Sequence, residues 1–187
     1  MVNLRFRYYL RLSIILILIV FTVACATKYK LYEGDEFTFS APTGYETKLY
    51  DPPYNGIGFE GSNPNSEMLL FSNVGHYPFF VIYRQEISQG GDLDTVCEAY
   101  MSKTSEKFPS YQFMSKRTIT FNKRTAIEYV HCEYLGEPYV QSREIWMEHN
   151  GWAHSLVCVH SRSGLPCEEI PEPDQCVQIV EGFKFKE

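Results

Sequence analysis

The sequence contains none of the short motifs that usually mark a catalytic or nucleotide-binding site. It has no GxSxG or HExxH motif, and the glycine-rich stretch NGIGFEG (residues 55–61) lacks the lysine and the serine or threonine of a phosphate loop. A Cys-His nucleophile would need a cysteine, a base and an orienting acid; Cys158, His131 and Glu133 are candidates, but no elbow or oxyanion-hole motif accompanies them. We therefore expect a protein that is not an enzyme and needs no cofactor.

The sequence is also short of positive charge. It has 17 Lys and Arg against 23 Asp and Glu. Three of the arginines (Arg5, Arg7 and Arg11) precede residue 25, so the remainder holds 14 basic and 23 acidic residues, a net charge of −9. Phosphate backbones and anionic lipids repel such a domain, which excludes nucleic acid as a partner and excludes membrane attachment through a basic patch.

The N-terminal apolar run is too short to span a membrane. As a helix, Leu12 to Ala24 would extend about 20 Å, against ~30 Å for the hydrocarbon core of a bilayer. Arginines before the run and small residues after it are typical of a secretory signal. Thr22-Val23-Ala24-Cys25 resembles a bacterial lipobox, with Thr22 in place of the usual Leu or Val. The pattern predicts cleavage after Ala24 and lipid attachment at Cys25; an uncleaved signal anchor is the alternative.

These features divide the chain into a signal peptide at residues 1–24, a lipidated tether at 25–35 and one domain at 36–187. No internal repeat, low-complexity segment or second boundary interrupts the domain, and about 163 residues are enough for one core. We expect acyl chains on Cys25 to hold the domain on the extracytoplasmic face of a cell membrane or outer membrane. Ala26 would favour the outer membrane in a cell that sorts lipoproteins by that residue.

Hydrophobic patterns predict an α+β domain. The clearest strands are residues 111–121, 125–136, 140–150 and 152–162, with NKR and HNG as turns. Asp92 can cap a helix that ends near Pro109 and has its apolar residues on one face: Leu93, Val96, Cys97, Tyr100 and Met101. A second helix, with Pro173 at its first position, places Cys176, Ile179, Val180 and Phe183 on one face. This order predicts an antiparallel β-sheet with flanking helices, an α/β/α sandwich.

Four segments resemble the PsbP-like family, whose fold is shared with a eukaryotic Ran-binding import factor and with many bacterial lipoproteins. YEGDEFTFSAPTGYE resembles the opening strand, FNKRTAIEYVHCEY the central hairpin, HNGWAHSLVC the next hairpin and VQIVEGFKF the closing helix. Tyr45 replaces a tryptophan of the family, and SRSGLPCEEIPEPDQC replaces the acid-rich segment of photosynthetic members. The resemblance implies a PsbP-like fold and a non-catalytic accessory or assembly module that binds a membrane protein or complex. The two departures argue against a role in a photosystem.

The cysteines of an exported domain suggest a disulfide. Cys167 and Cys176 lie nine residues apart around a proline-rich link, and we interpret them as a bridge that closes a small loop. The alternative is a reactive Cys176, whose thiol pKa would be lowered in the first turn of a helix. Cys132 and Cys158 could also pair across strands, which would leave Cys97 as a buried thiol.

Cys158 and His160 are the candidate metal ligands. On a strand they point to the same face, and thiolate with imidazole suits zinc or copper. His154 lies about 20 Å from His160 along an extended strand, so a third ligand must come from elsewhere, with Cys132 or His131 as candidates. A core-facing thiol with histidines at the rim is the alternative interpretation.

Aromatic residues suggest where a partner would bind. Tyrosine and tryptophan are enriched in the buried centres of protein interfaces. The first candidates for such a contact are Tyr45, Tyr50, Tyr54 and Trp152.

Overall fold

The computed structural model describes residues 29–50, 66–73, 76–134 and 139–187. Its elements are β1 (Tyr29–Glu33), β2 (Phe37–Pro42), β3 (Glu46–Tyr50), β4 (Ser66–Asn73), β5 (His76–Glu86), α2 (Leu93–Lys107), β6 (Gln112–Phe121), β7 (Arg124–Tyr134), β8 (Tyr139–His149), β9 (Trp152–Ser161), the 3-10 turn η1 (Cys167–Glu169), α3 (Asp174–Gly182) and β10 (Lys184–Phe185). The predicted signal peptide, the predicted lipidation site Cys25 and Tyr54 lie outside these residues.

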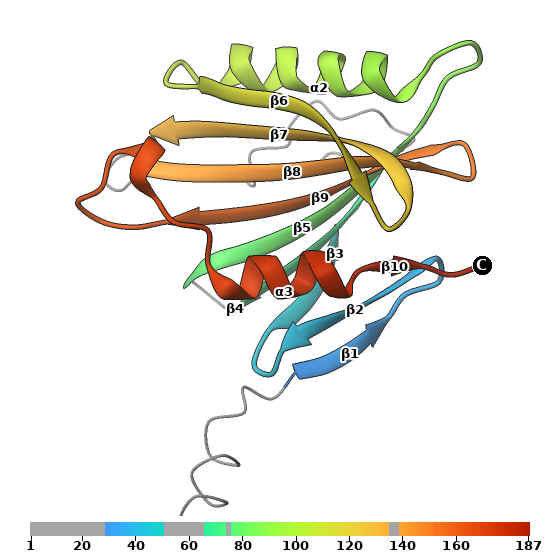
Figure 1. Ribbon diagram of the computed structural model, residues 1–187, viewed down its shortest axis with the longest axis horizontal. Helices are drawn as coiled ribbons and strands as arrows, with labels where there is room; N and C mark the ends of the chain where they lie inside the picture. The colour runs from blue at the N-terminus through green and yellow to red at the C-terminus, as the bar shows by residue number, and fades with distance from the viewer. Residues whose placement is uncertain (1–28, 51–65, 74–75, 135–138) are drawn as a thin grey trace, which may run out of the picture.

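The described strands form two antiparallel sheets. Seven pair in the order β3-β4-β5-β9-β8-β7-β6, and three pair in the order β1-β2-β10. Figure 1 shows α2 on one side of the large sheet, with α3 and the small sheet on the other. The α+β prediction with flanking helices is confirmed, but the sequence patterns did not reveal the second sheet. No helix within the described ranges is both long and apolar enough to cross a membrane.

Tight turns fix the register of the central strands. Asn122 and Lys123, between β6 and β7, have φ values of 48° and 65°, and Asn150 and Gly151, between β8 and β9, have 53° and 78°. Positive φ at both central residues is the type I′ geometry, whose twist matches that of antiparallel strands. The predicted NKR and HNG turns are thereby confirmed, and the register places Cys158 of β9 opposite Arg143 of β8.

A separate hydrophobic core lies on each face of the large sheet. On one face, α3 and the small sheet cover an apolar cluster that includes Phe39, Phe80, Ile145, Ile179 and Phe183. On the other face, α2 covers Tyr83, Trp146 and Val157 with Val96 and Cys97. Successive side chains of a central strand point to opposite faces of the sheet, so they pack into different cores. Both faces of the large sheet are therefore buried.

The first residues of α2 and α3 agree with those predicted from the sequence to within one residue. The Asp92 carboxylate accepts a hydrogen bond from the Thr95 backbone N–H at 2.8 Å, so the predicted cap of α2 is confirmed. Pro173 is the residue before α3 rather than its first residue, because its ψ of 145° is extended. The tether was predicted too long, since residues 29–33 form β1 and pair with β2.

Candidate functional site

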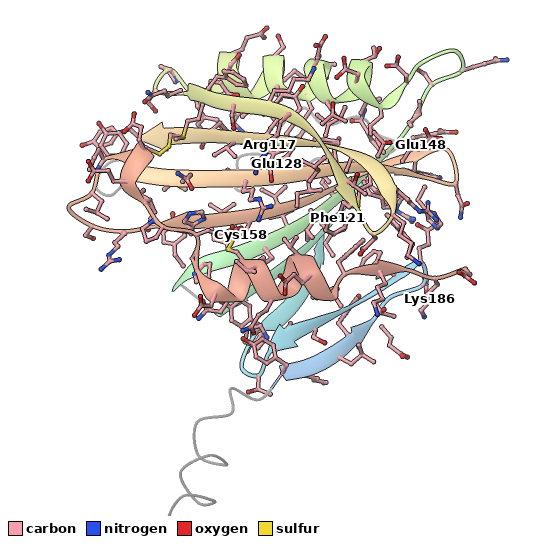
Figure 2. The ribbon with its side chains drawn as sticks, in the orientation of Figure 1. Arg117, Phe121, Glu128, Glu148, Cys158 and Lys186 are labelled. Carbon is pink, nitrogen blue, oxygen red and sulfur yellow. A yellow bond between two sulfur atoms is a disulfide. The ribbon has the colours of Figure 1, made fainter. Side chains whose placement is uncertain are left out.

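The two predicted metal ligands lie together on the α3 side of β9. Cys158 and His160 are two residues apart on the strand, and each is 1% exposed. The Cys158 Sγ lies 3.9 Å from the His160 Nδ1. Figure 2 shows the Cys158 sulfur between β9 and the helix α3. The strand geometry expected for this pair is therefore present, inside the core rather than at its rim.

Cys176 completes this cluster from the opposite layer. It lies in the first turn of α3, is fully buried and is bonded to Cys158, with their Cα atoms 5.9 Å apart. The donor atoms of Cys158, His160 and Cys176 all lie within 4.8 Å of one another. We call these three residues the Cys-His cluster. Sequence reasoning left Cys176 out of the metal hypothesis, although its place on the apolar face of the last helix indicated that it points into the core.

The imidazole of His160 is buried with one nitrogen unused. Its Nε2 has no hydrogen-bond partner among the described residues, and the atom is inaccessible to solvent. Burial lowers the pKa of the His160 imidazole to about 4, so the ring is neutral near pH 7 and carries a free lone pair. A buried polar group without a partner is uncommon in proteins, which makes this histidine a functional candidate.

The predicted disulfide between Cys167 and Cys176 is wrong in its pairing. Cys167 is bonded to Cys132, and Cys176 to Cys158. The reason is that the segment between β9 and α3 runs along the sheet: η1 lies against β8 and reaches Cys132 of β7, whereas α3 lies against β5 and reaches Cys158 of β9. The alternative pairing of Cys132 with Cys158 is wrong as well, because β8 lies between their strands.

The remaining described cysteine, Cys97, is a free thiol in the core beneath α2, as the sequence suggested. Burial is the main cause that raises the pKa of its thiol far above the ordinary value, and the Glu144 carboxylate adds to the effect. A thiol held in this protonated state is unreactive.

The residues weighed for nucleophilic catalysis lie on different faces of the sheet. Cys158 faces α3, whereas His131 and Glu133 face α2. His131 Nε2 donates to the Glu144 carboxylate at 2.9 Å, and the Trp146 indole N–H donates to the same carboxylate at 2.8 Å. Glu144 therefore fixes the His131 imidazole on the face of the sheet opposite to the Cys158 thiol. His131 cannot act as the base that activates Cys158.

His154 also takes no part in the Cys-His cluster. Its Nε2 lies 3.3 Å from the Glu36 carboxylate, which Arg84 contacts at 2.5 Å. Burial alone would raise the pKa of the Glu36 carboxyl, but Arg84 and His154 outweigh it and lower that pKa below its usual value. This group of charges joins the turn after β1 to strands β5 and β9.

A second ion-pair chain crosses the α3 face beside the Cys-His cluster. Buried Glu128 accepts hydrogen bonds from Arg117 and from Arg143, the latter at 2.8–2.9 Å, and Arg143 also contacts Glu172 at 2.5 Å. Figure 2 shows Arg117 and Glu128 facing each other on neighbouring strands. Glu172 lies just before α3, so the chain attaches the start of that helix to the sheet.

Of the aromatic residues proposed for a partner contact, two have described side chains. The Tyr45 hydroxyl donates to the Pro78 carbonyl at 2.9 Å and its ring packs on Phe80, so it serves the fold. Trp152 is half-buried, with the Arg84 guanidinium 4.9 Å from the centre of its ring. Tyr54 and the side chain of Tyr50 lie outside the described part of the chain.

No family model matches the chain, and no curated protein matches it. Among solved structures, the chain is similar to the solution structure of cyanobacterial PsbP (CyanoP) from Synechocystis sp. PCC 6803, with a TM-score of 0.59 and 10% identity over 86% of this chain and 94% of that one. A crystal structure of a protein of unknown function, PA94 from Pseudomonas aeruginosa, aligns with a TM-score of 0.39 and 18% identity over 78% and 98% of the two chains. The likeness to CyanoP shows that the chain has a PsbP-like fold.

Proposed function

We propose that this chain is a lipid-anchored, extracytoplasmic accessory module that binds a membrane protein or complex and catalyses no reaction. The observation that carries the proposal is the PsbP-like fold, which the chain shares with CyanoP over most of both lengths. The lipobox-like segment ending at Cys25 supports the anchor. Three carboxylates support the absence of catalysis, because each is paired with a basic side chain inside the fold and so has a structural role. They belong to Glu36, Glu128 and Glu144.

Exposed aromatic side chains supply a surface for the partner. Tyr77, Phe113, Tyr134 and Tyr139 are all exposed. The register places them at one end of the large sheet: Tyr134 pairs with Tyr139, Phe113 pairs with His131 of the same β7 end, and Tyr77 lies at the start of β5. The rings of Tyr134 and Tyr139 contact each other, with centroids 5.1 Å apart. We call these four residues the aromatic end.

Exposed tyrosines on an acidic domain suit a protein partner better than anionic lipid or nucleic acid. Tyrosine supplies a large contact area with few rotatable bonds and is enriched at interface hot spots. The net charge of −9 after residue 24 repels anionic lipid and nucleic acid, so the aromatic end fits a protein surface with neutral or basic rims.

The experiment is co-purification of the intact protein from its native membrane in mild detergent, with mass spectrometry of the retained proteins. One stoichiometric membrane partner is the expected result; recovery of the chain alone, at low salt, overturns the accessory role. The anchor is tested separately with Cys25→Ser. This variant is expected to lose the acyl mass and membrane attachment, and a variant with unchanged mass and attachment would refute lipidation.

The Cys-His cluster supports a second role, in binding a metal ion. The carrying observation is that two sulfurs and one nitrogen of a buried imidazole converge within 4.8 Å. Cys158 and His160 were the pair expected from the sequence, and Cys176 supplies the third ligand. Zinc content of the chain purified without added metal and kept reduced tests this role independently of any partner.

A further inference from the structure

The Cys-His cluster has the ligand set of a zinc site but holds its two sulfurs in a bond. Two thiolates and an imidazole are a known set of three zinc ligands, with a fourth position left for water. A sulfur bonded to another sulfur is not a thiolate, and the thiolate is the form that binds metal. The oxidation state of the Cys158–Cys176 pair therefore decides whether the cluster can bind a cation at all.

The spacing of the donors suits a tetrahedral zinc ion. With Zn–S near 2.3 Å and Zn–N near 2.0 Å, tetrahedral donors lie roughly 3.5–3.8 Å apart. The Cys158 Sγ and His160 Nδ1 are already 3.9 Å apart, and all three donors lie within 4.8 Å. Breaking the sulfur–sulfur bond lets the two sulfurs separate toward this spacing by side-chain rotation, without moving β9 or α3.

Two features of the surroundings suit metal binding once the bond is broken. Cys176 lies in the first turn of the nine-residue helix α3, where the positive end of the helix dipole stabilises a thiolate. α3 also stays attached without the bond, through buried Ile179, Val180 and Phe183 and through the Arg143–Glu172 ion pair. Reduction therefore frees ligands that the fold still holds together.

We propose that the Cys158–Cys176 disulfide is a redox gate, and that its reduced form binds one zinc-type cation together with His160. This inference rests on the metal-binding role and is independent of the accessory role. The other disulfide is not such a gate: Cys132 and Cys167 have the Met114 thioether beside them, 3.3 Å from the Cys132 Sγ, and lack an imidazole.

The reaction balances with a dithiol as reductant. Thiol–disulfide exchange passes two electrons and two protons from the dithiol to the Cys158–Cys176 bond, which gives two protein thiols and an oxidised dithiol. Zinc binding then displaces the two thiol protons into solvent while the His160 lone pair becomes the third ligand. Reoxidation by a disulfide-exchanging oxidant forms the sulfur–sulfur bond again and releases the ion.

The test compares the full-length chain, purified in detergent, in its oxidised and dithiol-reduced forms after anaerobic removal of the reductant. Zinc bound is measured by competition with a chromogenic chelator, and Co²⁺ is added in parallel as a probe of thiolate ligation. We expect one zinc per reduced chain, a thiolate-to-cobalt charge-transfer band, no zinc on the oxidised chain and release on reoxidation.

Matched variants assign the ligands. His160→Ala is expected to lower the zinc affinity of the reduced chain by at least about tenfold. His154→Ala, the buried histidine at the other end of the same strand face, should leave it unchanged, as should the double variant Cys132→Ser/Cys167→Ser. Differential alkylation of the wild-type chain needs no variant and should show zinc protecting Cys158 and Cys176.

Four results overturn the proposal, and they separate its parts. Equal zinc binding by the oxidised and reduced forms would show that the disulfide does not control binding, although the chain would still bind metal. Binding that depends on Cys132 and Cys167, or no binding by the reduced chain, would remove the site itself. A reduced chain that loses its folded circular dichroism spectrum and does not regain it with zinc would show that the bond serves stability alone.

Discussion

Cys167, in a single 3-10 turn after β9, is bonded to Cys132 of β7, 35 residues earlier in the chain, with their Cα atoms 6.2 Å apart. Cys176 is bonded to Cys158, 18 residues earlier. The two bonds attach both ends of the segment between β9 and α3 to the same face of the sheet. Mapping without reduction, with trypsin and a glutamyl endopeptidase that cleaves after Glu168 and Glu169 between the two cysteines, is therefore expected to yield peptides that join Cys132 to Cys167 and Cys158 to Cys176. A peptide that joins Cys167 to Cys176 would contradict the fold of this segment.

Loss of the longer bond should lower the free energy of unfolding. A closed loop of 35 residues restricts the unfolded chain by about 3–4 kcal/mol in the chain-entropy model. We expect Cys132→Ala/Cys167→Ala to lose up to that amount in guanidinium unfolding under oxidising conditions. Cys97→Ala, which removes a buried thiol that has no bond, is the control and should cost about 1 kcal/mol.

The buried carboxylate of Glu128 should make stability depend on acid. Burial alone would raise its pKa, but hydrogen bonds from Arg117 and Arg143 outweigh burial and lower the pKa below the ordinary value of 4.5. The native carboxylate therefore stays charged when the unfolded one is protonated, so its contribution is complete above about pH 4.5 and is lost as the pH falls through the native pKa.

Glu128→Gln tests this dependence. At pH 7 we expect a loss of about 2 kcal/mol in urea unfolding, because two arginines lose a charged acceptor. The difference from the wild type should shrink as the pH falls below about 4.5 and through the lowered native pKa, where the wild-type carboxylate becomes protonated too. Glu148→Gln, at an exposed position of β8, is the control. A difference that does not change between pH 3 and 7 would show that Glu128 acts by packing rather than charge.

Glu144 should be essential to the core beneath α2. Its carboxylate accepts hydrogen bonds from the buried His131 and Trp146, so Glu144→Leu leaves two buried donors without an acceptor. We expect a loss of about 2–4 kcal/mol in the free energy of unfolding and a change in tryptophan fluorescence. Glu148→Leu places the same side chain on the same face of β8 at an exposed position and should cost less than about 0.5 kcal/mol. Equal losses in the two variants would contradict this account.

The aromatic end should control partner recovery. Tyr134→Ser/Tyr139→Ser removes a pair of exposed, touching rings and is expected to reduce the co-purified partner by at least about tenfold, since hot-spot residues contribute 2 kcal/mol or more. Leu31→Ser removes an exposed apolar side chain from the small sheet and is the control. Loss of the partner only in Leu31→Ser would move the interface to the small sheet.

The strands and helices were largely predictable because their signals are local. The period of two in residues 152–162 and the helical spacing from Leu93 to Met101 depend on neighbours in the chain, as does the Asp92 cap. The same local alternation placed Cys158 and His160 on one face. The resemblance of four short segments to the PsbP-like family predicted the fold that the similarity to CyanoP shows.

The sequence by itself determined the acidic charge, which is a sum over residues. It also determined the two helices, the central strands and the shared face of Cys158 and His160, since each of these follows from residues within a few positions. Only the tertiary structure decided the disulfide partners, the third member of the Cys-His cluster and the pairing of β10 with β2. These contacts join positions 16 to 148 residues apart, and they depend on the path of the chain across the sheet after β9. Sequence spacing cannot give that path, because it follows from which apolar faces bury each other.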